Sequence, residues 1–160
     1  MPLSVDSVSG RQDLHRFVTF PWKVYAGDPH WVPPLIGDTK KVLQRHPFHE
    51  HAEVECFLAR RDGQIVGRIA AIRNDRHNEE HDEQIAFFGF FEVLDAEAAR
   101  ALLGKVEEWA RVRGLTAVRG PASFSSNEEW GLLVDGFDSS PAIMMTYNPP
   151  SYVEHIEGAG

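Results

Sequence analysis

A glutamate at the end of an apolar run is the first residue of this sequence that could do chemistry. Residues 85–91 read Ile-Ala-Phe-Phe-Gly-Phe-Phe, and Glu92 follows directly. A carboxyl group at the end of a buried strand is partly desolvated, and desolvation raises its pKa toward a range that suits proton transfer. Such a group could serve as a general base. The alternative is a glutamate at a strand end that faces solvent.

The segment after this glutamate begins with carboxylates. Residues 96–113 are predicted as the longest helix, with Asp95 capping its start and Gly114 placed to end it. One apolar stripe supports the helix: Ala99, Leu102, Leu103, Val106, Trp109 and Ala110. Asp95 and Glu97 stabilise the positive end of a helix dipole, and the same charges oppose an anion bound there.

Histidines raise the question of a metal site. His46, His49 and His51 lie close together, and His77 and His81 have the spacing of a pair on one helix face. Such a pair can bind zinc when further ligands complete the site. No third ligand follows from the spacing, and the stretch around His77 is polar like a loop. We therefore expect no metal site.

The composition is that of one globular domain. The chain has 160 residues, of which 42% are hydrophobic and 25% charged. Its net charge of -8 argues against general binding to nucleic acid or to an anionic membrane surface. Cys56 is the single cysteine, which excludes an internal disulfide and a multi-cysteine zinc site. The sequence shows no secretory leader and no apolar run of membrane-spanning length, so we expect a cytoplasmic protein.

Alternating residues predict an antiparallel meander ahead of the long helix. Apolar and acidic side chains alternate over residues 53–58, and Asp62 and Gly63 offer a hairpin turn. Residues 65–72 follow as the partner strand. The third strand, residues 85–93, is apolar nearly throughout, which is typical of a strand covered on both faces.

Further elements are predicted on both sides of this meander. They are a strand over residues 3–8, helices over 12–25 and 35–44, a strand over 116–119, a short helix over 125–135, a strand over 142–146 and a helical turn over 150–157. Pro21 should break or kink the first of these helices. The order is therefore strand, two helices, meander, long helix, strand and a mixed end.

That order resembles the GNAT superfamily of acyl-CoA-dependent N-acyltransferases. Five segments are similar to one bacterial branch of GNAT-like proteins: residues 20–35, 46–72, 87–92, 118–137 and 144–160. The resemblance implies an α/β (α+β) fold in one GNAT-like domain over residues 1–160, with a central mixed, mostly antiparallel sheet flanked by helices. GNAT domains end in two further strands, so the resemblance also implies a chain truncated at its C-terminus.

The resemblance also assigns residues to a reaction. Glu92 lies where many GNAT enzymes carry the general base that deprotonates an acceptor amine. Tyr152 matches the general acid that protonates the leaving thiolate, with Tyr147 as the alternative. The wall that binds the acceptor corresponds to three aromatic residues: Trp22, Tyr25 and Trp31. Plain core packing is the alternative for all these aromatic side chains.

The implied co-substrate is acetyl-CoA, whose pyrophosphate GNAT enzymes hold at the start of the long helix. The corresponding residues here are Val93, Leu94, Asp95, Ala98 and Ala99, joined by Asn127 from a later loop. The family pattern is Arg/Gln-x-x-Gly-x-Gly/Ala, and this segment contains neither the arginine nor the glycines. An ordinary helix start capped by an acid is the alternative, and for Asn127 the alternative is a helix cap.

The resemblance implies an N-acyltransferase that moves an acetyl or other acyl group from acyl-CoA to a small-molecule amine or a peptide acceptor. One alternative is a non-catalytic GNAT-like module that binds a ligand or a partner through a degenerate CoA loop. A relative of the Fem proteins, with an aminoacyl donor other than CoA, is the other. An unfinished sheet would leave an exposed edge strand, which is compatible with a homodimer.

Overall fold

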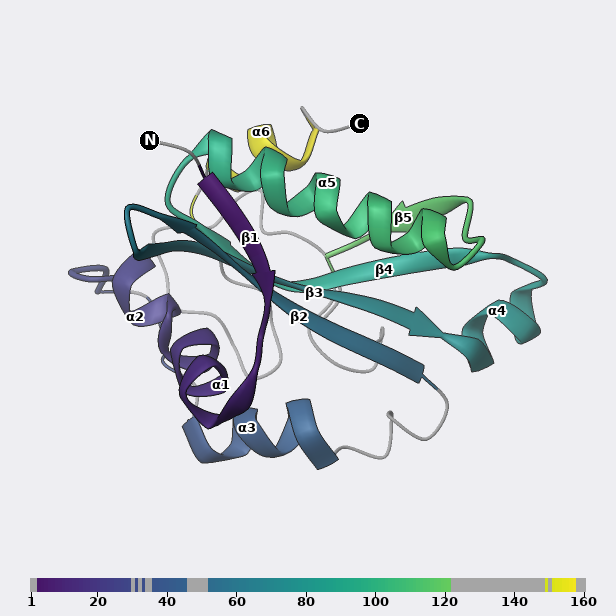
Figure 1. Cartoon of the computed structure of the whole chain (residues 1–160), viewed down its shortest axis with the longest axis horizontal. Helices are drawn as coiled ribbons and strands as arrows, with labels where there is room; N and C mark the ends of the chain where they lie inside the picture. Colours follow the sequence, from purple (N-terminus) through teal and green to yellow (C-terminus); the bar gives the residue numbers. More distant parts are fainter. Residues whose placement is uncertain are drawn as a thin grey trace.

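The backbone of the fold is one sheet, seen in a computed structural model that describes residues 3–29, 31, 33, 36–45, 52–121, 149 and 151–157. Its strands are β1 (Leu3–Ser7), β2 (Ala52–Arg61), β3 (Gln64–Asn74), β4 (Ile85–Val93) and β5 (Ala117–Arg119). They lie side by side in this same order (Figure 1). The first three pairings are antiparallel and the pairing of β4 with β5 is parallel. The predicted mixed, mostly antiparallel sheet is confirmed.

Helices cover both faces of the sheet. They are α1 (Gly10–Thr19), α2 (Pro21–Val24), α3 (Ile36–Arg45), α4 (Asp75–His81), α5 (Ala96–Val112) and α6 (Ser151–Glu157). In Figure 1, α5 and α6 lie on one face, and α1 and α3 lie on the other. Each face has its own apolar core. Leu102 and Val106 of α5 are fully buried in the first core, and Phe17 and Val18 of α1 are fully buried in the second.

The predicted meander and its turn are present. Asp62 and Gly63 join β2 to β3 with backbone φ angles of 54° and 77°, which are the left-handed values that a tight hairpin needs. Because helices cover both faces, β3 and β4 bury nearly every side chain. The third strand of the meander is therefore apolar for the predicted reason, which is that both faces of the sheet are covered.

The structure differs from the prediction in two helices. The helix predicted over residues 12–25 is two helices, because Pro21 starts α2 and cannot continue the hydrogen bonds of α1. The polar stretch that was predicted to be a loop contains α4. Its first turn is capped by Asn74, whose side chain accepts a hydrogen bond from the His77 amide, and Asp82 ends it with a φ of 51°. The predicted elements over 125–135 and 142–146 lie outside the described residues.

One extra residue interrupts the pairing of β3 with β4. Arg68 lies opposite Glu92, whereas Ala70 lies opposite Gly89, so β4 contains one more residue than β3 over this interval. Phe90 is in this bulge and has a φ of 51°, which is unusual for a residue with a side chain. The bulge changes the alternation of β4, since every residue beyond it faces the opposite side from the one that a regular strand would give it.

The described pairing of β4 with its parallel neighbour is short. Within the described residues, β5 pairs with β4 only along Ile85–Phe87. Beyond that point the side chain of Tyr152, from α6, reaches the edge of β4, where its hydroxyl accepts a hydrogen bond from the Val93 amide at 2.8 Å. The end of β4 is therefore held by a helix side chain at a position where a regular sheet would have another strand.

In the part of the chain that the structure describes, no helix is long and apolar enough to cross a membrane. The same residues contain no group of three or more His, Cys, Asp or Glu side chains arranged to hold a metal ion. His77 and His81 stack on each other in α4 with ring centroids 4.3 Å apart. His46, His49 and His51 lie outside the described residues.

Candidate active site

Four ionisable side chains are buried together where β4 ends. Glu92 of β4 is 7% exposed and Arg68 of β3 is 8% exposed. Tyr25, directly after α2, and Tyr152 of α6 are also buried. Burying groups of this kind is costly unless they satisfy one another, so their gathering at one place marks a candidate site.

Glu92 is held on the side of the aromatic residues that the sequence assigns to an acceptor. The Tyr25 hydroxyl donates a hydrogen bond of 2.8 Å to Oε1 of Glu92. The ring of Trp31 stacks on that of Tyr25, with centroids 5.0 Å apart and planes 10° apart. Trp22 meets Trp31 edge-on with centroids 5.1 Å apart and is 36% exposed. The three predicted aromatic residues thus form one cluster that leads from the surface to the buried carboxylate.

Arg68 is the cation of this site. It lies directly opposite Glu92 in the sheet, and the two side chains attract each other electrostatically. Its Nη1 donates a 2.8 Å hydrogen bond to the Phe17 carbonyl, and its guanidinium lies 5.0 Å and 5.8 Å from the ring centres of Phe17 and Phe90. Nε has no hydrogen-bond partner among the described residues. A lone buried cation is strongly unfavourable, so Glu92 is its natural compensating charge.

Both tyrosine hydroxyls stay protonated. Burial, followed by the charge of Glu92, raises the pKa of Tyr25 far above its usual value. Burial raises the pKa of Tyr152 in the same way, again with the charge of Glu92 as the next cause. Tyr152 and Glu92 also share a hydrogen bond. The Tyr152 hydroxyl further contacts the Val93 carbonyl at 3.2 Å. Glu92 therefore interacts with two tyrosine hydroxyls that can donate a proton.

Several backbone amides at the start of α5 already donate hydrogen bonds within the protein. Leu94 donates its N–H to the Val66 carbonyl at 3.0 Å. Ala98 donates to the Asp95 carboxylate at 2.9 Å, and Ala99 donates to the Asp95 carbonyl at 3.2 Å. The predicted cap is present, and the side chains of Ala98 and Ala99 are fully buried.

An arginine closes the same helix end from outside. Arg61 donates from Nη1 to Asp95 at 2.8 Å and from Nη2 to Glu97 at 2.9 Å. The Arg61 hydrogen bond is the main reason why the pKa of Asp95 is lowered. A pyrophosphate would have to displace both the cap and this ion pair, so CoA phosphates do not fit the start of α5 as it stands. Asn127 lies outside the described residues.

Replacing Asp95 with alanine tests the cap. The variant loses the hydrogen bond to the Ala98 amide, and we expect it to lower the free energy of unfolding by about 1 kcal/mol. Chemical denaturation of the variant and of the unchanged protein measures the difference. Asp95→Asn keeps an acceptor oxygen at the cap and should recover most of the loss. Equal stability of the alanine variant would show that the cap contributes little.

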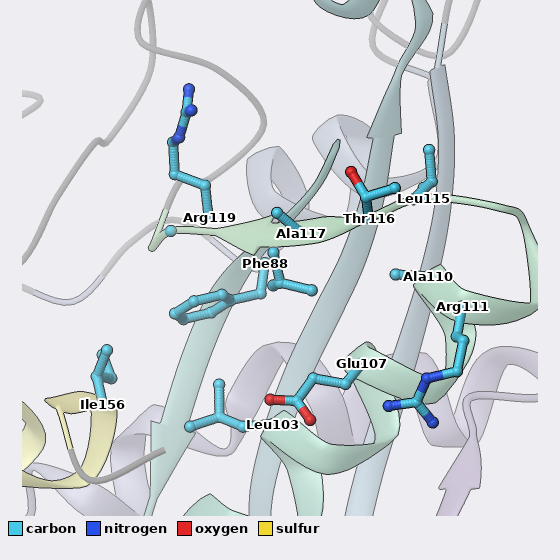
Figure 2. A pocket seen from close by; sticks show the side chains of 12 residues that line it. Phe88, Leu103, Glu107, Ala110, Arg111, Leu115, Thr116, Ala117, Arg119 and Ile156 are labelled. Carbon is cyan, nitrogen blue, oxygen red and sulfur yellow. The ribbon is translucent and has the colours of Figure 1, made fainter. Parts of the chain in front are cut away.

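A cavity lies on the α5 side of β4. Its volume is about 590 Å³, and Figure 2 shows Phe88 and Leu103 in its wall with Ile156 nearby. Glu107 and Arg111 of α5 are the charged residues on one side of it. Phe88 belongs to the core beneath α5, and the residues that line this cavity include none of the three residues of the aromatic cluster.

Solved structures with the same architecture decide the fold. A tandem GNAT protein from the clavulanic acid biosynthesis pathway, solved without AcCoA, matches with a TM-score of 0.63 and 17% identity, over 99% of this chain and 43% of that one. An aminoglycoside acetyltransferase from an uncultured soil metagenomic sample, in complex with sisomicin, matches with a TM-score of 0.52 and 16% identity, over 76% of this chain and 78% of that one. The chain has the GNAT fold. The fold predicted from the resemblance is confirmed.

Two curated proteins are similar in sequence to this GNAT-fold chain. One is Protein YghO of Escherichia coli K12, 36% identical over 152 residues, which covers 94% of this chain and 39% of that protein. The other is a bacterial ceramide synthase of Caulobacter vibrioides, 37% identical over 162 residues, which covers 99% of this chain and 42% of that protein. The chain thus spans about two fifths of the length of these relatives. No family model matches it.

The structure brings together most of the site residues that the sequence nominates, and it adds one. Glu92, Tyr25 and Tyr152 meet at the end of β4 of the GNAT fold. Arg68 was missed. Its sequence signal is a single charged residue inside the apolar run that forms β3, and such a residue needs a buried partner.

Proposed function

We propose that the protein is an N-acyltransferase that moves an acyl group from a thioester donor to an amine. Acetyl-CoA is the first donor to test, and a small-molecule amine or a peptide is the acceptor. The observation that carries the proposal is the buried carboxylate of Glu92, which follows the bulge in β4 and lies opposite Arg68. A general base is needed there because the attacking amine must lose a proton.

The acceptor side is the aromatic cluster. Rings of tyrosine and tryptophan attract cations, and a carboxylate behind them attracts the same charge. Trp22 gives the cluster a solvent-exposed end, and Tyr25 joins it to Glu92 by a hydrogen bond. An amine that arrives as an ammonium ion would therefore be drawn toward the base that deprotonates it.

The donor side is the cavity beneath α5. A volume of about 590 Å³ is in the usual range of small-ligand sites. Its apolar wall, which includes Phe88 and Leu103, suits the acyl and pantetheine portions of a thioester. In this arrangement Glu92 takes the proton of the amine, and Tyr152 supplies a proton to the sulfur that leaves.

One curated relative supports an amine acceptor. A ceramide is an amide between a fatty acid and the nitrogen of a long-chain amino alcohol, and a bacterial ceramide synthase is similar to 99% of this chain through 42% of its own length. The acceptor panel should therefore include a long-chain amino alcohol beside short amines and a peptide amine. The donor panel should likewise include long-chain acyl-CoA beside acetyl-CoA.

The test is release of free thiol from acyl-CoA by the full-length protein, followed by mass spectrometry of the amide product. Donors and acceptors are varied in a matrix, and each acceptor is also incubated with donor alone as the blank. Amine-dependent thiol release with a matching amide supports the proposal. Absence of turnover throughout the matrix would overturn it.

A non-catalytic ligand-binding module is the second candidate. The observation in its favour is the start of α5, where Asp95 and Arg61 occupy the position of a phosphate site. A module of this kind would bind a ligand in the thiol-release experiment without consuming it. Calorimetry with CoA and with the acceptors, run beside the turnover assay, separates the two.

The occupied helix start leads to a prediction about the donor. An acyl-pantetheine lacks the nucleotide and its pyrophosphate. Its KM is expected to be within about threefold of that of the matching acyl-CoA, because the occupied start of α5 makes no phosphate contact that the shorter donor could lose. Loss of such a contact would raise the KM by more than about threefold. Initial rates with the two donors at one acceptor concentration give the ratio. A KM about a hundredfold higher for acyl-pantetheine would contradict the prediction.

A further inference from the structure

We propose that Tyr25, Glu92 and Tyr152 form a proton relay across the end of β4, and that Tyr25 is the residue that receives the proton of the acceptor amine. The inference rests on the proposed N-acyltransferase function. It gives Tyr25 a catalytic role in addition to its place in the acceptor wall, and it places Glu92 one step behind the reacting nitrogen.

The position of the Tyr25 hydroxyl is the first support. It donates to Oε1 of Glu92 at 2.8 Å, while its ring stacks on Trp31. Tyr25 is thus the member of the aromatic cluster that joins Trp31 to the carboxylate. An amine that enters along Trp22 and Trp31 meets this hydroxyl in front of Glu92. Because the Glu92 carboxylate already accepts this hydrogen bond, it can take the tyrosine proton at the moment when the hydroxyl oxygen receives a proton from the amine.

Tyr152 gives the relay its other end. It comes from α6, and its ring packs against Phe91 at 5.2 Å in the core beneath α5. Tyr25 reaches the carboxylate from the segment after α2. The two hydroxyls therefore meet Glu92 from separate elements, one beside the acceptor cluster and one from the core beneath α5.

Arg68 favours the ionised form of Glu92, the middle group of the relay. It lies opposite Glu92 in the sheet, and its positive charge favours the ionised carboxylate that can accept a proton. Arg68, Tyr25 and Tyr152 are charged or titratable groups that interact with Glu92. Both tyrosines are donors at neutral pH, so Glu92 is the group that can act as a base.

The proton balance closes. The ammonium ion first releases one proton to solvent, and the neutral amine nitrogen then attacks the thioester carbon, so a C–N bond forms and the C–S bond breaks. One nitrogen proton passes to Oη of Tyr25 while the Tyr25 proton passes to Glu92. Tyr152 gives its proton to the leaving thiolate sulfur and regains one from Glu92. The products are an amide and a free thiol, and all three residues return to their starting protonation states.

The decisive variant is Tyr25→Phe in the full-length protein. We expect kcat to fall by at least about a hundredfold while the acceptor KM changes by less than about threefold. Trp31→Leu is the contrast, because it should raise the acceptor KM more than it lowers kcat. The loss in Tyr25→Phe should also be larger for a strongly basic amine than for hydrazine, whose nitrogen gives up its proton more readily. A merely structural role would lower both alike.

Two results would overturn the relay alone, and a third would overturn the proposed function together with the relay. A Tyr25→Phe protein that folds, judged by circular dichroism, and keeps kcat within threefold removes Tyr25 from the proton path. Where that variant does not fold, difluorotyrosine at position 25 keeps the ring and acidifies the hydroxyl, and an unchanged pH profile of kcat would overturn the relay equally. If the unchanged protein turns over no donor with any acceptor, the proposed function itself fails, and the relay fails with it.

Discussion

Glu92→Gln is expected to abolish most turnover, with kcat lower by about 10²–10⁴-fold. Glutamine has nearly the shape of glutamate and can still accept the hydrogen bond from Tyr25, but its amide cannot take up a proton. The measurement is the rate of thiol release at saturating donor and acceptor. Binding of each substrate, measured by calorimetry, should change much less than the rate because the walls of the site are unaltered.

Glu108→Gln is the matched control for this result. Glu108 is on α5, and its side chain is 65% exposed with one long contact to Lys105. The same chemical change at that position should leave the rate unchanged. If Glu92→Gln retains full turnover, the carboxylate is not the base and the proposed mechanism is wrong, whatever the identity of the substrates.

The second large effect concerns stability. Arg68→Met is expected to lower the free energy of unfolding by about 3–5 kcal/mol, because it leaves the Glu92 carboxylate buried without its compensating charge. The double variant Arg68→Met, Glu92→Gln removes both charges and should lose less than the sum of the two single variants. Chemical denaturation of all four proteins gives the coupling free energy between the two sites.

An exposed arginine supplies the control for the cycle. Arg100 lies on the exposed face of α5, and Arg100→Met should change stability by less than about 0.5 kcal/mol. Additive losses in the Arg68 and Glu92 cycle would show that the two charges do not depend on each other. In that case Arg68 would be held by Phe17 and Phe90 alone.

Glu92 could be nominated from the sequence because its signal is local. An apolar run that ends in a carboxylate is visible in adjacent residues, and so is the aromatic content of residues 20–31. The long helix is equally local, since its apolar stripe, the Asp95 cap and the glycine after it all lie within one segment. Such features depend on short-range periodicity and capping, which a sequence displays directly.

Arg68 and the two-sided environment of Glu92 depend on pairing between distant segments. Nothing near Arg68 in the sequence shows that it will lie opposite Glu92, because the register of β3 and β4 is set by the whole sheet. The short α4 was missed for a different reason. It buries none of its residues, so it has no apolar stripe, and its evidence is confined to the caps Asn74 and Asp82.

The bulge at Phe90 makes the direction of Glu92 depend on a residue count. Phe91 and Val93 lie in the core beneath α5, and Glu92 between them faces the other way, opposite Arg68, because the bulge takes up the one residue by which β4 exceeds β3. Deletion of one residue at the bulge would make the two strands equal over this interval and would leave Glu92 opposite Arg68 in a regular strand. If the bulge were lost with the residue count unchanged, the carboxylate would turn into the apolar core. The length of this strand and the presence of the bulge are thus coupled, and a relative with β4 one residue shorter would keep the carboxylate on the acceptor side without a bulge.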